Sequence, residues 1–207
     1  MGILDQFQRP TGQLGRCVAA LMNKDHYKLT TWGLKHVIIK SNDVILDVGC
    51  GGGKTIERLA KQVPQGKVFG IDYSPDMVAY AKEVNKEFIA QNHIEIHEAS
   101  VDKTGLPSNF FDLVIACETY YFWPNLTDAF KELSRVLKSE GQLLMINEMI
   151  KDGVYDLKDA VMIEKTHLQL YYLDEIRDLL QSVGFIEVEI FRKKGSPWNA
   201  IVAKNLA

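Results

Sequence analysis

The stretch VILDVGCGGGKT, residues 44–55, decides the fold of this chain of 207 residues. A short apolar run at 44–46 leads into a glycine-rich turn at 49–53. Apolar residues then recur at positions 56, 59, 60 and 63, which places them on one face of a helix. The sequence therefore predicts a strand, a glycine turn and a helix in direct succession.

Short apolar runs alternate with helical spacing from about residue 43 to 150, which is typical of parallel strands joined by crossover helices. We predict further strands at 68–71, 94–96, 111–116 and 142–146, and helices at 74–88, at 126–137 with a stop at Gly141, and at 176–183. After the last helix, residues 186–190 and 198–203 flank a turn at 193–197. Such a hairpin requires the final strand to run antiparallel to its neighbour.

Two segments fall outside this alternation, at 1–40 and at about 151–172. In an open parallel sheet the ligand crevice lies beyond the carboxyl ends of the strands, where covers are built. We therefore interpret 1–40 as an N-terminal helical cover and about 151–172 as a lid-like insertion, both within one domain spanning 1–207. The alternative is that they only pack over the sheet.

Composition and charge exclude several classes of protein. The chain is 46% hydrophobic and 25% charged, which suits a globular core and excludes intrinsic disorder. Its net charge of -3 provides no basic field for a nucleic acid. No apolar stretch is long enough to cross a bilayer, and the beginning of the chain lacks the pattern of a secretion signal. We expect a cytoplasmic protein without a membrane or nucleic-acid partner, and its oligomeric state stays open.

The three cysteines, Cys17, Cys50 and Cys117, form no CxxC motif and have no nearby pair of histidines. We therefore expect no metal site and a reducing compartment. Free cysteines of this kind usually pack as small apolar residues, so neither of the last two is assigned as a nucleophile.

Three glycine motifs compete for residues 47–55. A P-loop, GxxxxGK[ST], needs glycine at position 48, which holds valine. A dinucleotide fingerprint, GxGxxG from position 49, needs glycine at 54, which holds lysine. The third pattern, an acidic residue at a strand end followed by GxGxG, is met in full by Asp47, Gly49, Gly51 and Gly53.

Five motifs in this order resemble those of the class I S-adenosylmethionine-dependent methyltransferases: VILDVGCGGGKT, VFGIDYSPDMVAYAKE, HEASVDKTGLP, NFFDLVIACETYYFWPN and ELSRVLKSEGQLLMI. The resemblance runs from about Asp43 to the closing hairpin. It implies an α/β fold with a Rossmann-like, doubly wound sheet of seven strands, in the order 3-2-1-4-5-7-6 with strand 7 antiparallel. It also implies S-adenosylmethionine as the cofactor and a small-molecule type of methyltransferase.

The resemblance assigns a cofactor site. Asp47 can balance the ammonium of the methionine part, and Asp72 can present two acceptor oxygens to adjacent ribose hydroxyls. Tyr73 and Met77 would flank the adenine ring, whose edge the segment around Ser100 would contact. The cofactor residues implied in this way are Asp47, Gly49, Gly51, Asp72, Tyr73, Met77, Ser100, Val101 and Cys117.

The acceptor side is predicted after the fourth strand, in the segment CETYYFWP at 117–124. Glu118 could act as a base or bind a cationic acceptor, and Tyr121 could orient the acceptor through its phenol, so these two are the catalytic candidates. Packing and local capping are the alternative roles for this segment. Candidates for substrate binding are Trp32, Tyr120, His167 and Tyr171, while Glu148, Asn147, His26 and Tyr172 are secondary candidates.

Methyl transfer from a sulfonium is an in-line displacement that depends mainly on alignment, so a missing catalytic triad does not argue against an enzyme. Nucleic-acid base methyltransferases tend to carry [DNS]PP[YFW] where this chain reads CETY, which favours a small-molecule acceptor. Two alternatives stay open. One is a non-catalytic S-adenosylmethionine-binding protein, and the other is an NAD-dependent oxidoreductase, which would need its third glycine one position later.

Overall fold

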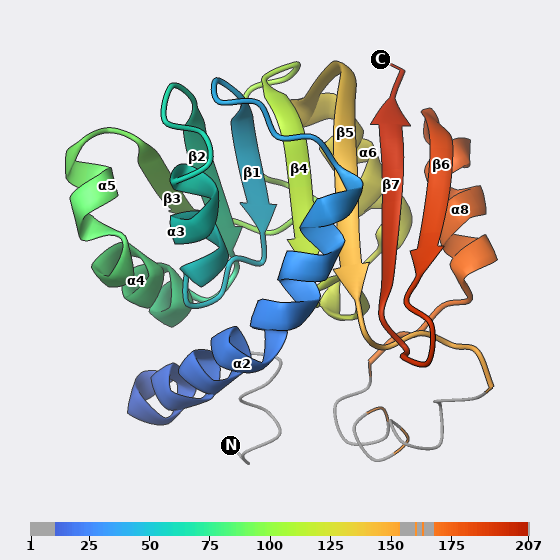
Figure 1. Ribbon diagram of the computed structural model, residues 1–207, viewed down its shortest axis with the longest axis horizontal. Coiled ribbons are helices and arrows are strands. Elements are labelled where there is room, and N and C mark those ends of the chain that lie inside the picture. The colour runs from blue at the N-terminus through green and yellow to red at the C-terminus, as the bar shows by residue number, and fades with distance from the viewer. Residues whose placement is uncertain (1–10, 154–159, 161–162, 164–167, 207) are drawn as a thin grey trace.

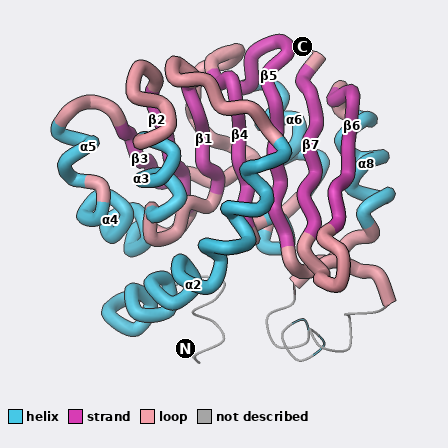
Figure 2. The backbone as a smooth tube through the Cα atoms, viewed as in Figure 1, coloured by secondary structure: helices cyan, strands magenta, loops and turns pink. Residues whose placement is uncertain are grey.

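The computed structural model describes residues 11–153, 160, 163 and 168–206. A seven-stranded sheet carries helices on both of its faces (Figures 1 and 2). The strands are β1 (Val44–Val48), β2 (Lys67–Asp72), β3 (Ile94–Glu98), β4 (Phe111–Cys117), β5 (Leu137–Asn147), β6 (Phe185–Arg192) and β7 (Asn199–Asn205). The helices are α2 (Gly12–Gly33), α3 (Lys54–Ala60), α4 (Pro75–Val84), α5 (Lys86–Ala90), α6 (Leu126–Val136) and α8 (Leu173–Ser182), with short 3₁₀ turns η1 (Leu34–His36) and η2 (Tyr120–Phe122).

The strand order is β3-β2-β1-β4-β5-β7-β6. β1 to β5 pair in parallel, while β7 pairs antiparallel with both β5 and β6. This arrangement confirms the predicted order and the reversed last strand. β4 lies beside β1, on the side opposite β2, although it is distant from β1 in sequence. The order in which strands are added to the sheet therefore reverses between β1 and β4, and ligands bind at such a switch point.

Two apolar layers hold the helices to the sheet. On one face, side chains of α6 and α8 such as Phe130 and Leu180 pack against Val114 and Met145. On the other face, α2, α3 and α4 contribute a second buried cluster, to which Ile56 belongs. The central strands are covered on both sides, which explains their continuous apolar sequence.

The predicted helix over 74–88 is interrupted at Asn85. Its buried side chain donates hydrogen bonds to the carbonyls of Ala81 and Gly53, at 2.9 and 3.0 Å. These bonds tie the end of the helix to the glycine turn. α4 therefore ends at Val84, and a separate short helix, α5, begins at Lys86.

The prediction that Gly141 stops the helix after residue 126 is wrong. α6 ends at Val136, and Gly141 lies inside β5, which begins directly after the helix. The side-chain amide of Asn205 on β7 donates to the carbonyls of Ser134 and Leu137, at 3.0 and 3.3 Å, and so closes the helix end from another element. A Cβ on Gly141 would lie 3.0 Å from the carbonyl oxygen of Phe111, which explains glycine at this point of the sheet.

The N-terminal cover corresponds to α2 over its described residues. Its C-terminal end packs so closely on β5 that a Cβ on Gly33 would lie 2.6 Å from side-chain atoms of Ile146. Its N-terminal half continues past the carboxyl ends of the strands (Figure 1) and is tied to α4 by an ion pair of Arg16 with Glu83 at 2.8 Å. The predicted lid-like insertion at about 151–172 lies largely outside the described residues.

Candidate functional site at the strand ends

A cavity of about 390 Å³ lies at the carboxyl ends of β1, β2 and β4 and is bordered by α2. The sequence-predicted cofactor residues all line it: Asp47, Gly49, Gly51, Asp72, Tyr73, Met77, Ser100, Val101 and Cys117. These residues come from four separate parts of the chain, and the fold brings them together. Their contact with a cofactor stays a prediction.

The glycine turn has a left-handed backbone at Gly49, Gly51 and Gly53, with φ values of 68°, 49° and 75°. A Cβ on Gly51 would meet no atom within 4 Å, and this residue lines the cavity. A Cβ on Gly49 would lie 2.5 Å from Cγ2 of Thr119. The first glycine is therefore required by packing, whereas the second keeps the cavity open.

Asp47 on β1 is almost fully buried, at 2% exposure, and lines the cavity. Its Oδ2 atom has no hydrogen-bond partner among the described residues. Burial, and then the negative charge of Asp72, raise the pKa of this carboxyl to about 8. A buried acceptor in this state favours a cationic partner, because a positive charge would stabilise the ionised form.

Asp72, at the end of β2, holds the turn and the next helix in place. Its Oδ2 accepts the backbone N–H of Gly51, and its Oδ1 accepts that of Ser74, each at 2.9 Å. Burial raises the pKa of this carboxyl, while the two backbone hydrogen bonds lower it. Each carboxylate oxygen can accept a second hydrogen bond, so the side chain can still receive two hydroxyls.

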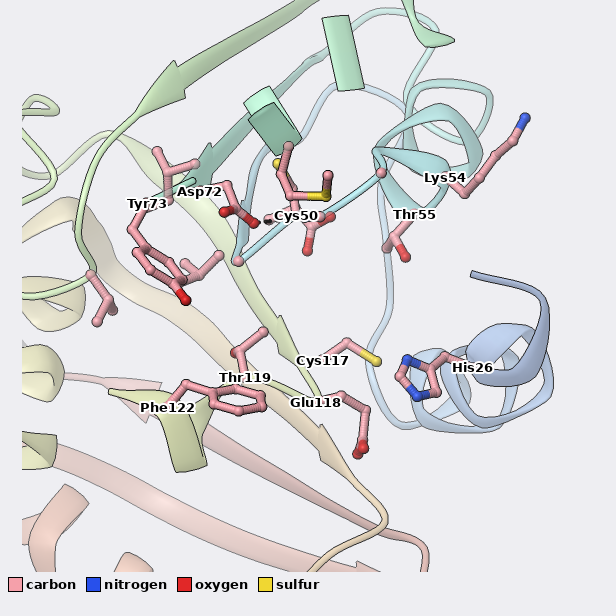
Figure 3. Close-up of a pocket in the computed structure, with 18 of the residues that line it drawn as sticks. His26, Cys50, Lys54, Thr55, Asp72, Tyr73, Cys117, Glu118, Thr119 and Phe122 are labelled. Carbon is pink, nitrogen blue, oxygen red and sulfur yellow. Dashed lines mark hydrogen bonds between the residues drawn. The ribbon is translucent and has the colours of Figure 1, made fainter. Parts of the chain in front are cut away.

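The proposed adenine side of the cavity combines exposed and buried groups. Tyr73 is 41% exposed, whereas Met77 is 1% exposed and faces the cavity from α4. Ser100, after β3, donates its hydroxyl hydrogen bond to Asp102. Figure 3 shows Tyr73 and Phe122 on one side of the cavity, with His26, Cys117 and Glu118 on the other.

Glu118 directly follows β4 and lines the cavity. It is 7% exposed and has a φ of 58°, a left-handed conformation that is uncommon for a residue other than glycine. Its Oε1 accepts the backbone N–H of Glu148 at 2.6 Å, and its own N–H donates to the carbonyl of Ile146 at 2.9 Å. The end of β5 thus fixes the carboxylate at the cavity wall.

The two tyrosines of η2 are buried and do not line the cavity, which is bounded instead by Phe122 and Trp123. The hydroxyl of Tyr120 donates to the carbonyl of Met149 at 3.1 Å. The hydroxyl of Tyr121 has no partner among the described residues, and burial followed by the charge of Glu118 raises its pKa well above the usual value. Tyr121 was predicted to orient the acceptor through its phenol. Because it does not line the cavity, it could do so only indirectly, through Glu118, and not by direct contact with the acceptor.

Trp32 and Tyr171, two further residues predicted to bind the substrate, do not line the cavity. Trp32 packs against Trp198 and His36, with ring centroids 6.3 and 4.9 Å away. Tyr171 lies in a separate depression and donates to Gln169 at 3.0 Å. His167 lies outside the described residues.

Residues that the sequence did not assign as site residues come chiefly from α2 and α3. Thr30 places its hydroxyl 3.3 Å from Sγ of Cys117. Arg58 lies 4.2 Å above the ring of Tyr27 and donates to Thr31 at 2.7 Å. The apolar stripe of α2 does not identify these residues as part of a site. The sequence indicates them only through the spacing of four residues between His26 and Thr30, which places both on one helix face.

Comparison with known proteins gives a consistent result. A family described as a methyltransferase domain matches residues 46–145. The chain is 28% identical over 122 residues to the uncharacterized methyltransferase YdaC of Bacillus subtilis, covering 59% of this chain and 65% of YdaC. It is 29% identical over 158 residues to a malonyl-[acyl-carrier protein] O-methyltransferase of Geobacter sulfurreducens, covering 71% of this chain and 57% of that protein.

The fold is also found among solved structures. Phosphoethanolamine N-methyltransferase 2 of Haemonchus contortus, in complex with phosphomonomethylethanolamine and S-adenosylhomocysteine, superposes with a TM-score of 0.77 at 15% identity. The match covers all of this chain and 61% of that one. The chain thus spans less than two thirds of the length of each of these relatives. Among the described residues, no helix is long and apolar enough to cross a membrane.

Proposed function

Because the chain belongs to the class I S-adenosylmethionine-dependent methyltransferase family, we propose that it transfers a methyl group from S-adenosylmethionine to a small-molecule acceptor. One observation carries the proposal. The residues that the sequence assigns to the cofactor line a single cavity at the switch point of the sheet. An accidental grouping of these residues, drawn from four parts of the chain, would be hard to explain.

The side chains at this cavity have the chemistry that the cofactor requires. The unsatisfied, buried oxygen of Asp47 suits the ammonium of the methionine part. Beside it, Gly51 leaves space where any other residue would place a Cβ. Asp72 would hold the ribose hydroxyls, and Tyr73 with Met77 would flank the adenine. When bound, S-adenosylmethionine supplies an activated methyl group on a positively charged sulfur.

The protein's own contribution is alignment and exclusion of water. Holding donor and acceptor in line can lower a barrier by roughly 7–11 kcal/mol, and no covalent intermediate with the enzyme is needed. Phe122 and Trp123 offer an apolar surface to an acceptor, and Glu118 offers a fixed hydrogen-bond acceptor or base between them and α2. These three residues are our candidates for positioning the acceptor.

A small-molecule acceptor is supported by three features. The chain carries a net charge of -3, which disfavours a nucleic acid. α2 lies across the strand ends (Figure 1), and its residues His26, Tyr27 and Thr30 line one side of the cavity, which leaves less room for a large acceptor. The structural relative from Haemonchus contortus binds a small phosphorylated amine together with S-adenosylhomocysteine.

Calorimetry with S-adenosylhomocysteine and NAD tests the cofactor. We expect one molecule of S-adenosylhomocysteine to bind per chain, and preferential binding of NAD would contradict the proposal. For the reaction, the enzyme is incubated with methyl-deuterated S-adenosylmethionine and a fractionated metabolite pool, and the labelled product is identified by mass spectrometry. Cofactor binding without any labelled product from such pools would instead favour a non-catalytic binding protein.

A further inference from the structure

Three potential ligand side chains meet beside the cavity, and two of them, His26 and Glu118, line its wall on the side away from Tyr73 (Figure 3). His26 comes from α2, Glu118 follows β4, and Glu148 follows β5. Each offers one ligand atom, and these atoms all lie within 4.8 Å of one another. The three residues belong to separate elements, so the tertiary fold creates the cluster. None of them is among the residues that we assign to the cofactor.

The backbone of Glu118 is held in an unfavourable conformation. A left-handed backbone is unfavourable by roughly 1–2 kcal/mol for a residue with a Cβ. The backbone N–H of Glu148 nevertheless fixes one oxygen of the Glu118 carboxylate at 2.6 Å. Metal-ligating carboxylates are oriented in this way by hydrogen bonds from neighbouring groups. Strain and orientation at one buried carboxylate indicate a site with a function.

A second observation points to a ligand at the same place. The side chain of Tyr121 is 2% exposed, and its hydroxyl forms no hydrogen bond of ordinary geometry with a described residue, although it lies close enough to the Glu118 carboxylate for that group to raise its pKa. Leaving a buried hydroxyl unsatisfied costs about 1–3 kcal/mol. A water molecule on a bound ion would supply the missing partner.

We propose that His26, Glu118 and Glu148 bind one divalent transition-metal ion at the wall of the cavity. One imidazole nitrogen and two carboxylates suit Mn²⁺, Fe²⁺ or Zn²⁺, whereas Mg²⁺ and Ca²⁺ prefer oxygen ligands alone. Three protein ligands leave coordination positions open for water or for an oxygen atom of a substrate. Binding of the ion does not depend on the methyl donor, but its use in positioning the acceptor rests on the proposed function.

Titration of the intact protein with Mn²⁺ tests the site, with calorimetry for stoichiometry and electron paramagnetic resonance for the bound ion. We expect one site per chain. Glu118→Gln, Glu148→Gln and His26→Ala should each weaken Mn²⁺ binding at least tenfold. Glu118→Gln retains an acceptor oxygen for the backbone N–H of Glu148, so the strand end should stay folded. Glu87→Gln and His97→Ala, both at exposed positions away from the cavity, are matched controls that should bind as the original protein does.

Absence of Mn²⁺ binding at about millimolar concentration, or binding that all three variants retain, would overturn the proposal. Binding of methylamine in place of Mn²⁺ would also overturn it, because the cluster would then be a receptor for an ammonium group. Affinity for S-adenosylhomocysteine is measured on the same samples without metal. If only the metal experiment fails, the proposed cofactor site stands, and if only cofactor binding fails, the metal site stands.

Discussion

The carboxylate of Asp72 accepts a hydrogen bond from the backbone N–H of Gly51 at 2.9 Å, across the gap between the end of β2 and the glycine turn. The other oxygen of the same carboxylate accepts the N–H of Ser74, at the start of α4. One side chain therefore connects the turn, the strand and the helix that surround the cavity. Binding of a ribose to this carboxylate would be coupled to the geometry of the turn.

Asp72→Ala should weaken binding of S-adenosylhomocysteine by about 1.5–3 kcal/mol, or roughly ten- to 150-fold, the scale of hydrogen bonds to a charged group. It should also lower the free energy of unfolding, because the N–H groups of Gly51 and Ser74 lose their acceptor. Calorimetry and chemical denaturation measure the two effects. Asp174→Ala, at an exposed position on α8, is the control. Unchanged affinity in a folded Asp72→Ala protein would refute the ribose assignment.

Gly51→Ala separates backbone strain from loss of space in the cavity. Any residue with a Cβ is strained by roughly 1–2 kcal/mol at a left-handed φ, and at Gly51 the Cβ would also enter the cavity. Gly195→Ala is a matched control, because Gly195 has a φ of 71° and open space around it but lies in the turn between β6 and β7. Both variants should lose similar stability in chemical denaturation, and only Gly51→Ala should lose cofactor affinity. If Gly51→Ala and Gly195→Ala bound S-adenosylhomocysteine with equal affinity, Gly51 would not face the bound cofactor.

The presence of most strands and helices could be predicted because each has its own local pattern, and the tight hairpin gave the direction of β7, whereas the order of the strands was implied by the family resemblance. Element ends were less predictable. The helix end at Asn85 depends on the carbonyl of Gly53, and that of α6 depends on Asn205. Both contacts join residues far apart in the sequence, so no local pattern contains them. Gly141 therefore looked like a helix stop although it lies within a strand.

The gathering of the predicted cofactor residues at one cavity could be expected, since most of them follow predicted strands and parallel strands end at one edge of a sheet, while their assignment to the cofactor came from the resemblance and stays a prediction. The part of the site that α2 contributes could not be predicted. Hydrophobic periodicity shows which face of a helix is apolar, but it does not show where the helix lies over the sheet. The close contact of Gly33 with Ile146 sets that position, and it brings Thr30 to Cys117. Tyr120 was predicted to bind the substrate, whereas its hydroxyl donates a hydrogen bond to the carbonyl of Met149 and the residue does not line the cavity.

Gly49→Ala should be more destabilising than Gly51→Ala by about 1–3 kcal/mol, because its Cβ would lie 2.5 Å from Cγ2 of Thr119. Replacement of Thr119 by serine removes that methyl group and keeps the hydroxyl. The double variant Gly49→Ala, Thr119→Ser should therefore recover most of this difference, leaving the cost of the left-handed backbone and a tight contact of 3.1 Å with the Cβ of residue 119. Free energies of unfolding for the two single variants and the double variant give the coupling. Strictly additive effects would show that the two side chains do not collide.

Asp47 should make cofactor binding dependent on pH. Its pKa is raised from an ordinary value of 3.8 to about 8, so between these values the folded protein holds a proton that the unfolded chain has lost. Stability therefore falls as pH rises through this window and levels off above it. A cationic ammonium beside Asp47 favours the ionised carboxylate, so binding below about pH 8 should release up to one proton, and affinity for S-adenosylhomocysteine should rise towards that pH.

Calorimetry at about pH 7 in buffers with different ionisation enthalpies measures this proton release directly. The asparagine of Asp47→Asn cannot ionise, so cofactor binding to this variant should release only the protons that Asp72 contributes. Asp72 can contribute because burial raises the pKa of its carboxyl as well. The same variant should lose much of the decline in stability between about pH 5 and 8. Proton release that is equal in the original protein and in Asp47→Asn would mean that the ammonium does not bind beside this carboxylate, and the methionine part of the cofactor would then have to lie elsewhere in the cavity.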